Sequence, residues 1–560
     1  MCGAEDSFFQ KYCWQYPATV LACVYQVWTK VGFAMRDYQL PGRSSVFAQN
    51  GMCATSHPLA AKVAVQILES GGNAVDAAIA GAVLLGLCEP AMTGIGGDCF
   101  VLLKPAGEDR VVALNGSGRA PGGLSADKMR ADGHKTVPLR QPEAVTIPGA
   151  VDAFCKLSRD WGKIGLKATL APAIYYAEAG VPVAGRVSFD WHAAQENLTG
   201  EARRHYLFDG KPPRTGQVFQ APQQAEVLRR IAIEGRRGFY EGEVAEDMVS
   251  SLSALGGVHT LDDFANTACE YTEPVSGTYK GVDLIEHPPN GQGATAILMN
   301  NILAHFDVPA MQPFGSLRAH IEAEAAKLAY DTRNRFIADA DHTSRLDHLL
   351  SLETAANLAA LIDPKNAMKS PATLSESVHK DTIYITVVDK DQMAVSLIYS
   401  VFKSFGSGLA SNKFGILFQN RGAGFNLEKG HINEAAGNKR PMHTIIPAML
   451  AKEGRVFMPF GVMGGAYQPN GHARFVTNLI DFNMHPQAAI DAPRCFSDAG
   501  DMQVERGYSE KVRQELVDMG HEVSTPNSPI GGAQAILIDY ENGVLEGASD
   551  PRKDGCALGY

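Results

Sequence analysis

The chain has 560 residues, of which 45% are hydrophobic and 20% are charged. This is the composition of an ordinary globular protein, and it excludes a disordered chain, a collagen-like fibre and a coiled coil. The 50 basic and 61 acidic residues give a net charge of -11, which argues against a protein that binds nucleic acid by neutralising phosphates. We expect no nucleic-acid partner.

The first 34 residues form an extension whose role the sequence does not define. An apolar run within residues 16–35 is interrupted by Gln26 and Lys30. It is shorter than the ~18 apolar residues that a membrane-spanning helix needs. Acidic residues precede the run, whereas a signal peptide begins with basic ones. We therefore expect a cytoplasmic protein without a membrane partner, and export stays open as the alternative.

The ten cysteines are spread along the chain without a Cys-x-x-Cys pair or a close histidine. This spacing does not predict a zinc site, and a chain of this length does not need disulfides. We interpret the cysteines as buried or free thiols. No motif implies a cofactor, so we expect neither a cofactor nor a metal.

Helical periodicity dominates the first two thirds of the chain. It predicts a helix over 59–70, closed by two glycines, and a second over 74–87, whose apolar residues on nearly all sides indicate burial. A glycine-rich turn then leads into a strand predicted at 99–103. Further helices are predicted over 165–181, 223–234 and 316–339.

The last of these helices carries charged residues. Glu322, Glu324 and Lys327 line a polar side of it. Two acidic residues, Asp339 and Asp341, stand at its end and suggest a metal only faintly. We interpret them as a solvated helix end.

Strands dominate after about residue 375. Residues 382–388 and 393–399 are β-rich runs joined by a short polar turn, which predicts a hairpin. A helical run follows at 473–481. Further apolar strand segments are predicted at 445–450, 456–463 and 533–539. Strands with helices outside them indicate a layered sandwich with much antiparallel sheet.

Two features of this region could carry chemistry. Thr382 opens the predicted hairpin, although a threonine there is ordinarily only a good strand former. Gly464 and Gly465 follow an apolar strand, where they could turn the chain or present two backbone N–H groups to an oxyanion.

Seven motifs occur in a consistent order along the chain. They are GGNAVDAAIAG (71–81), GIGGD (94–98), DTIYITVVDKD (381–391), FGSGL (405–409), NKRPMHT (438–444), VMGGA (462–466) and GASDPRKDGCALG (547–559). In this order they resemble the γ-glutamyltransferase family, which also includes cephalosporin-acylase-like and oxamate-amidohydrolase-like members. The resemblance covers residues 36–560 and not the extension.

The resemblance implies an N-terminal-nucleophile hydrolase with an α+β fold, a four-layer αββα sandwich. Such proteins cut themselves before a threonine, and the matching bond here is Asp381–Thr382. The expected large subunit is 35–381, after the extension 1–34, and the expected small catalytic subunit is 382–560. The two are expected to stay together as an αβ heterodimer forming one intertwined domain, and a dimer of such units stays open.

The chemistry of this arrangement is consistent with the residues. The Thr382 hydroxyl is a poor nucleophile without a base, and cleavage frees an α-amine on the same residue, with a pKa near ~7.7–8.0. Ser400 matches a family hydroxyl that orients the nucleophile, or is an ordinary strand serine. Gly464 and Gly465 match the glycines of the oxyanion hole.

The substrate-binding positions depart from the family pattern. Family enzymes hold the glutamyl α-carboxylate with an arginine, and that position falls on Ser117 here. Arg119, two residues away, could substitute for it. Gly424 stands where the family carries an aspartate for the α-ammonium group.

Other residues are new at their positions. Arg421 could grip a carboxylate through two hydrogen bonds, or it is a surface or structural arginine. The paired hydroxyls after Lys-Arg-Pro become His443 and Thr444, and His443 either contacts substrate or is a core histidine. Phe402 replaces an asparagine. We therefore predict Arg119, Arg421, His443 and Thr444 as substrate-binding residues.

The function hypotheses follow from this pattern. The first is a hydrolase or acyltransferase of γ-glutamyl amides such as glutathione, which works through an acyl-enzyme. The alternative is an amidohydrolase for a non-glutamyl amide of a small carboxylic acid, which the altered pocket fits better. A non-catalytic binding protein with the same fold is the third hypothesis, and it predicts an uncut chain.

Overall fold

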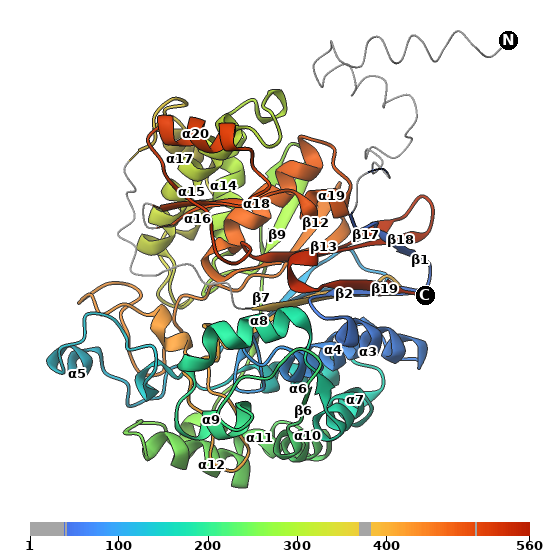
Figure 1. Ribbon diagram of the computed structural model, residues 1–560, viewed down its shortest axis with the longest axis vertical. Helices are drawn as coiled ribbons and strands as arrows, with labels where there is room; N and C mark the ends of the chain where they lie inside the picture. Colours follow the sequence, from blue (N-terminus) through green and yellow to red (C-terminus); the bar gives the residue numbers. More distant parts are fainter. Residues whose placement is uncertain (1–38, 40–41, 369–381, 499–500) are drawn as a thin grey trace.

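The structure is a computed structural model that describes residues 39, 42–368, 382–498 and 501–560. Two seven-stranded sheets lie face to face between two layers of helices (Figure 1). This confirms the expected four-layer αββα sandwich. The extension 1–34 and Asp381 lie outside the described residues.

The first sheet has the strand order β19-β2-β10-β11-β3-β4-β7, and all its neighbours are antiparallel. Its centre is the predicted hairpin of β10 and β11, in which Ile383 pairs with Tyr399. Every residue of both strands is buried, because the second sheet covers one face and helices cover the other. The strands are β2 (Gly51–Thr55), β3 (Asp98–Lys104), β4 (Val112–Gly116), β7 (Glu270–Thr272), β10 (Ile383–Asp389), β11 (Ala394–Ser400) and β19 (Cys556–Gly559).

The second sheet has the strand order β1-β18-β17-β13-β12-β9-β8. The Ser396 hydroxyl of β11 donates to the Phe460 carbonyl of β13 (3.2 Å), so the middles of the two sheets are in direct contact. The strands are β1 (Val46–Ala48), β8 (Val275–Tyr279), β9 (Val282–Glu286), β12 (Ala448–Lys452), β13 (Arg455–Met463), β17 (Gly532–Asp539) and β18 (Val544–Ser549).

Helices cover the outer faces of both sheets and confirm the predicted segments. On the first sheet, α4 begins with a capping box in which Asn73 accepts from the amides of Val75 and Asp76, and Asp76 accepts from the amide of Asn73. The principal helices here are α3 (Pro58–Glu69), α4 (Ala74–Cys88), α6 (Ala150–Trp161), α7 (Gly165–Ala179) and α10 (Pro222–Glu234). Those on the second sheet are α14 (Gly293–Leu303), α15 (Ser316–Phe336), α17 (Leu352–Ala359) and α18 (Gln468–Ile480).

Shorter elements complete the periphery. They are helices α5 (Ala126–Ala131), α8 (Gly185–Ala194), α9 (Gly200–Tyr206), α11 (Arg237–Tyr240), α12 (Gly242–Ser253), α13 (Leu261–Ala265), α16 (Leu346–Leu350), α19 (Pro486–Asp491) and α20 (Glu510–Asp518), and strands β5 (Val181–Pro182), β6 (Val218–Phe219), β14 (Cys495–Asp498), β15 (Asp501–Val504) and β16 (Glu522–Ser524). Within the described part of the chain, no helix is both long and apolar enough to span a lipid bilayer.

The polar side of α15 is buried, because helices and the C-terminal segment pack over it. Glu322 pairs with Arg318 (2.8 Å), and Lys327 pairs with Glu324 (2.6 Å). The interpretation of Asp339 as part of a solvated helix end is wrong. Its carboxylate is buried and accepts from the Arg119 guanidinium (3.0 Å) and from the Arg440 amide (2.7 Å).

Candidate active site

Thr382 and Ser400 meet at the open end of the β10–β11 hairpin. Because Ile383 pairs with Tyr399, the residues just outside this pair also face each other. The buried Thr382 hydroxyl donates to the Ser400 hydroxyl at 3.4 Å. The Ser400 oxygen also accepts from the amide of Phe402 (2.9 Å), which fixes its position. The hairpin register therefore places an oriented hydroxyl beside the predicted nucleophile.

Gly464 and Gly465 form a tight turn at the end of β13. Their φ angles of 127° and 56° lie in the region that favours glycine. Neighbouring Met463 packs with Tyr384 and Ile398 of the hairpin in one cluster between the sheets. This contact places the turn toward the hairpin end that carries Thr382. Among the described residues, neither glycine amide donates a backbone hydrogen bond outside the helices and strands.

Helix α15 holds the carbonyl groups of this turn. The Gly465 carbonyl accepts from the side-chain NH2 group of Gln292 (3.1 Å). The side-chain oxygen of Gln292 accepts in turn from the Arg333 guanidinium (2.7 Å). The Tyr330 hydroxyl donates to the Ala466 carbonyl. The Gly464 carbonyl accepts from the Tyr467 amide (3.1 Å), and because this carbonyl shares a peptide plane with the Gly465 N–H, the contact orients that N–H group.

Asp98 stands beside Ser400 as its register partner at the start of β3. One oxygen of its buried carboxylate accepts from the amides of Gly118 (3.0 Å) and Gly149 (3.0 Å) and from the side chain of Gln419 (2.8 Å). Burial raises the pKa of Asp98 to about 6, although the nearby Arg421 charge and these hydrogen bonds oppose the shift. Asp98 thus makes several hydrogen bonds within the site, which its place in the GIGGD motif does not predict.

His443 bonds to the second oxygen of Asp98 through Nε2 (3.2 Å). Its Nδ1 accepts from the amide of Ile445 (3.3 Å), so the ring proton belongs on Nε2. Burial lowers the pKa of His443 well below its usual value, and the charge of Arg421 adds to the effect. The ring is therefore neutral at pH 7 and packs against Phe100.

Arg421 supplies a buried positive charge to the same region. Its guanidinium donates to the Thr444 hydroxyl (2.9 Å) and lies 4.0 Å from the centre of the Phe402 ring. Phe402 in turn bonds to Ser400 through its amide. Contacts thus run continuously from Thr382 to Arg421, and Arg421 is not a surface residue.

Arg119 is not brought into this group. Its side chain is 38% exposed and ion-paired with Asp339. It lines a separate groove of about 290 Å³, whose other walls include Ser117, Glu270 and Arg440. Neither Thr382 nor Arg421 lines this groove. Among the described residues, no hydrogen bond or ion pair joins Arg119 to the other predicted site residues, and its role in substrate binding stays a prediction.

The structure explains the glycine at 424. A Cβ atom added there would lie 2.6 Å from the Met442 carbonyl oxygen, so no side chain fits unless the backbone moves. The Ser117 hydroxyl already accepts from Asn290 (3.1 Å). The position expected to hold an α-carboxylate is therefore Ser117, whose hydroxyl is already hydrogen-bonded. The position expected to hold an α-ammonium group is Gly424, which has no side chain.

The comparisons with known proteins agree with the motifs and the fold. The family model described as gamma-glutamyltranspeptidase matches residues 60–560. The chain belongs to the γ-glutamyltranspeptidase family. It is similar to the glutathione hydrolase-like YwrD proenzyme of Bacillus subtilis, with 36% identity over 92% of this chain and 99% of that protein. It is also similar to the oxamate amidohydrolase proenzyme of Klebsiella pneumoniae, with 33% identity over 92% of this chain and 100% of that protein.

A solved structure supports the same assignment. The crystal structure of cephalosporin acylase from Bacillus halodurans superposes with a TM-score of 0.87 and 37% identity, over 94% of this chain and 99% of that one. This γ-glutamyltranspeptidase-family chain is therefore an enzyme, which leaves the non-catalytic hypothesis without support.

Proposed function

We propose that this enzyme is a self-processing threonine amidohydrolase whose substrates carry a carboxylate on the acyl part but no neighbouring ammonium group. The contact between Thr382 and Ser400 at the hairpin end carries the nucleophile assignment. Buried Arg421 and the lack of room at Gly424 support the substrate class. No carboxylate can stand at 424 to balance an ammonium group, and an unpaired buried charge is costly.

The proposed reaction begins within the chain. The Thr382 hydroxyl attacks the Asp381 carbonyl, the peptide C–N bond breaks to give an ester, and water hydrolyses the ester. The products are a carboxylate on Asp381 and a free α-amine on Thr382. That amine is part of the peptide bond before cleavage and cannot act as a base, so processing creates the catalyst.

The same hydroxyl then reacts with substrate. The α-amine takes its proton, the oxygen attacks the amide carbon, and the N–H groups of Gly464 and Gly465 stabilise the oxyanion. One such donor is typically worth about 3 kcal/mol in the transition state. The amine product leaves with the proton, and water or an amine acceptor resolves the acyl-enzyme. Arg421 and Thr444 bind the distal carboxylate.

Intact mass under denaturing conditions tests the processing step. Wild type should give two species, corresponding to 1–381 and 382–560, and Thr382→Ala should give one species of 60.0 kDa. Thr386→Ala is a matched control, because Thr386 is a buried threonine of β10, the strand that begins directly after Thr382, and this variant should be cut. A single uncut species from folded wild type would refute the mechanism.

A pair of anilides tests the substrate class. Glutaryl-p-nitroanilide and γ-glutamyl-p-nitroanilide differ only by the α-ammonium group. We expect kcat/KM to be at least about tenfold higher for the glutaryl compound, a difference of ~1.4 kcal/mol. Arg421→Met should remove most of this activity through KM. A preference for the γ-glutamyl compound, or no hydrolysis of either by the cut enzyme, would contradict the proposed substrate class.

Cleavage of γ-glutamyl amides such as glutathione is the second candidate. It is supported by the names of two Bacillus subtilis relatives, a glutathione hydrolase-like proenzyme at 36% identity and a glutathione hydrolase proenzyme at 27%. It predicts the reverse order of the two anilides.

A further inference from the structure

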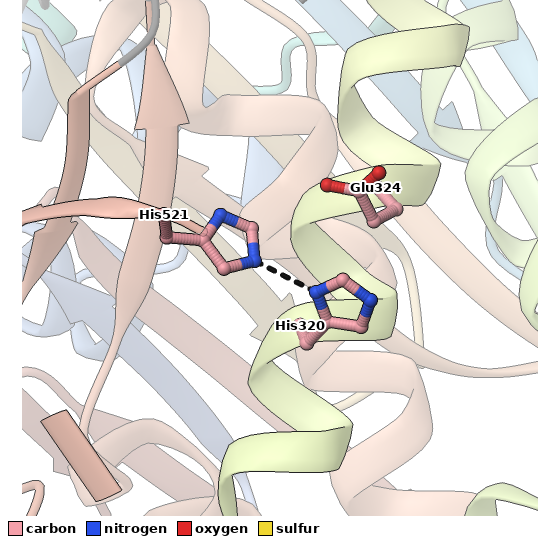
Figure 2. A group of neighbouring side chains, drawn as sticks. All are labelled: His320, Glu324 and His521. Atoms are coloured by element: carbon pink, nitrogen blue, oxygen red, sulfur yellow. Dashed lines mark hydrogen bonds between the residues drawn. The ribbon is translucent and has the colours of Figure 1, made fainter. Parts of the chain in front are cut away.

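Two histidines and a glutamate lie together away from the catalytic site (Figure 2). His320 and Glu324 are one turn apart on α15, and His521 immediately precedes β16. One nitrogen or oxygen atom from each residue lies within 4.8 Å of the others. All three side chains are buried, so the group is an internal polar cluster and not part of the solvated surface.

The hydrogen bonds of His320 prepare it for a ligand on one side. Its Nε2 lies 2.8 Å from the Asp363 carbonyl, which can only accept, so Nε2 carries the ring proton. The lone pair of Nδ1 then faces Nε2 of His521 at 2.7 Å, the contact drawn as a dashed line in Figure 2. A backbone carbonyl on the far nitrogen is the usual way in which metal-binding histidines are oriented.

We propose that His320, Glu324 and His521 bind a divalent zinc ion, with His320 Nδ1, His521 Nε2 and a Glu324 oxygen as ligands and water as the fourth. Two imidazoles and one carboxylate form a known zinc donor set. Tetrahedral bonds of ~2.0–2.1 Å place two nitrogens about 3.3 Å apart, so the two rings must separate by only about half an ångström. The ion replaces the proton between the rings, and that proton moves to Nδ1 of His521 through solvent.

Lys327 sets the strength of this site. Its ammonium group donates to Glu324 (2.6 Å) and to the Met368 carbonyl (2.8 Å), which places a positive charge near the ion. The carboxylate keeps lone pairs for the metal, because each oxygen can accept more than one bond. The like charge lowers the affinity, so removing it should tighten binding.

The three proposed ligands lie on both sides of the proposed cleavage site in the sequence. His320 and Glu324 precede residue 381, and His521 follows residue 382. If the chain is cut as proposed above, the ion ties the two pieces together. Zinc binding itself does not depend on cleavage, so the uncut Thr382→Ala variant should bind zinc as wild type does.

Titration of chelator-treated protein with zinc chloride tests the proposal. Calorimetry should show one ion per chain for wild type, for Thr382→Ala and for the control His305→Ala, which removes an exposed histidine. His521→Ala should lose at least about 10- to 100-fold in affinity. Cobalt chloride should give wild type, and not His521→Ala, the visible absorption of a tetrahedral site.

Lys327→Met provides an independent check if His521→Ala does not fold. It should bind zinc more tightly than wild type, and zinc should raise its thermal midpoint further at the same concentration. Wild type that takes up no zinc, or His521→Ala or Lys327→Met that binds zinc as wild type does, would overturn the proposal. A bound ion in uncut Thr382→Ala would uphold it even if wild type failed to process.

Discussion

The carboxylate of Asp98 joins four separate parts of the chain at the candidate active site. It accepts hydrogen bonds from the amides of Gly118 and Gly149 and from the side chains of Gln419 and His443. These bonds favour the ionised form of Asp98, whereas burial favours the neutral form. The effect of burial is the larger of the two, so the pKa of Asp98 is raised. Because Asp98 lies opposite Ser400, we expect its protonation state to matter for catalysis.

We expect the activity to depend on this proton. Catalysis needs an unprotonated α-amine on Thr382, with a pKa near ~7.7–8.0, and an ionised Asp98, whose pKa is about 6. As the pH falls below the first value, log kcat/KM should decrease with a slope of one. Below about pH 6 both groups are protonated, and the slope should approach two.

Stopped-time assays from pH 5 to pH 9 measure this profile. Asp98→Asn, which cannot ionise, should be less active but should keep a slope of one throughout the acidic limb. A wild-type slope that stays at one down to pH 5 would show that the ionisation of Asp98 does not matter for catalysis.

At the scale of single elements, α15 and the turn after β13 act together. The carbonyls of Gly465 and Ala466 in this turn are held by α15, the Ala466 carbonyl by Tyr330 directly and the Gly465 carbonyl by Arg333 through Gln292. A Cβ atom at Gly464 would lie 2.9 Å from the Cα atom of Gly531, so the turn also has little room to move. We therefore expect the proposed oxyanion hole to depend on two packed elements and not on the glycines alone.

Removing the tyrosine hydroxyl should loosen the turn. Tyr330→Phe leaves the Ala466 carbonyl without this partner, which we expect to cost about 1–3 kcal/mol of stability. We also expect kcat to fall about tenfold while KM changes little, because the oxyanion forms only in the transition state.

Tyr279→Phe is a matched control for this experiment. It removes a hydroxyl that bonds to Asp481 (2.6 Å) at the end of β8. This variant should lose similar stability without the loss of kcat. Equal kcat values for the two variants would argue against a role of α15 in catalysis.

Across the whole molecule, both sheets combine strands from before residue 381 with strands from after residue 382. The β10–β11 hairpin lies between β2 and β3 in the first sheet, and β12 pairs with β9 in the second. Each segment therefore supplies the hydrogen-bond partners for the strand edges of the other. Cutting the chain at one bond does not separate surfaces that are buried together.

We expect the cut enzyme to remain a tight complex that unfolds in one step. All four tryptophans precede residue 382, so the tryptophan fluorophores all belong to the large piece, whereas far-UV circular dichroism reports on both pieces. The two signals should change together in urea. Because unfolding also separates the pieces, the midpoint should rise with protein concentration.

Uncut Thr382→Ala serves as the control, and its midpoint should not depend on concentration. Two separate transitions in the cut enzyme would indicate pieces that fold independently. The same would follow if the pieces eluted apart on gel filtration without denaturant.

The sequence by itself determined the main elements and the proposed catalytic pair. The α3 and α4 helices and the β10–β11 hairpin follow from local periodicity, and the hairpin brings Thr382 and Ser400 together because a short turn fixes the register of its strands. The ordered motifs indicated the family and the four-layer fold. These features depend on residues close in sequence, or on a pattern shared along the chain.

Only the tertiary structure decided the surroundings of that pair. It places Asp98 against His443 and Arg421 against Thr444. It also pairs Arg119 with Asp339. At Gly424 it leaves no space for a side chain. It also places His320 against His521 inside what reads in sequence as a polar helix face. The reason is physical: burial and the partner of a charge are set by segments far apart in the chain, and no local pattern records them.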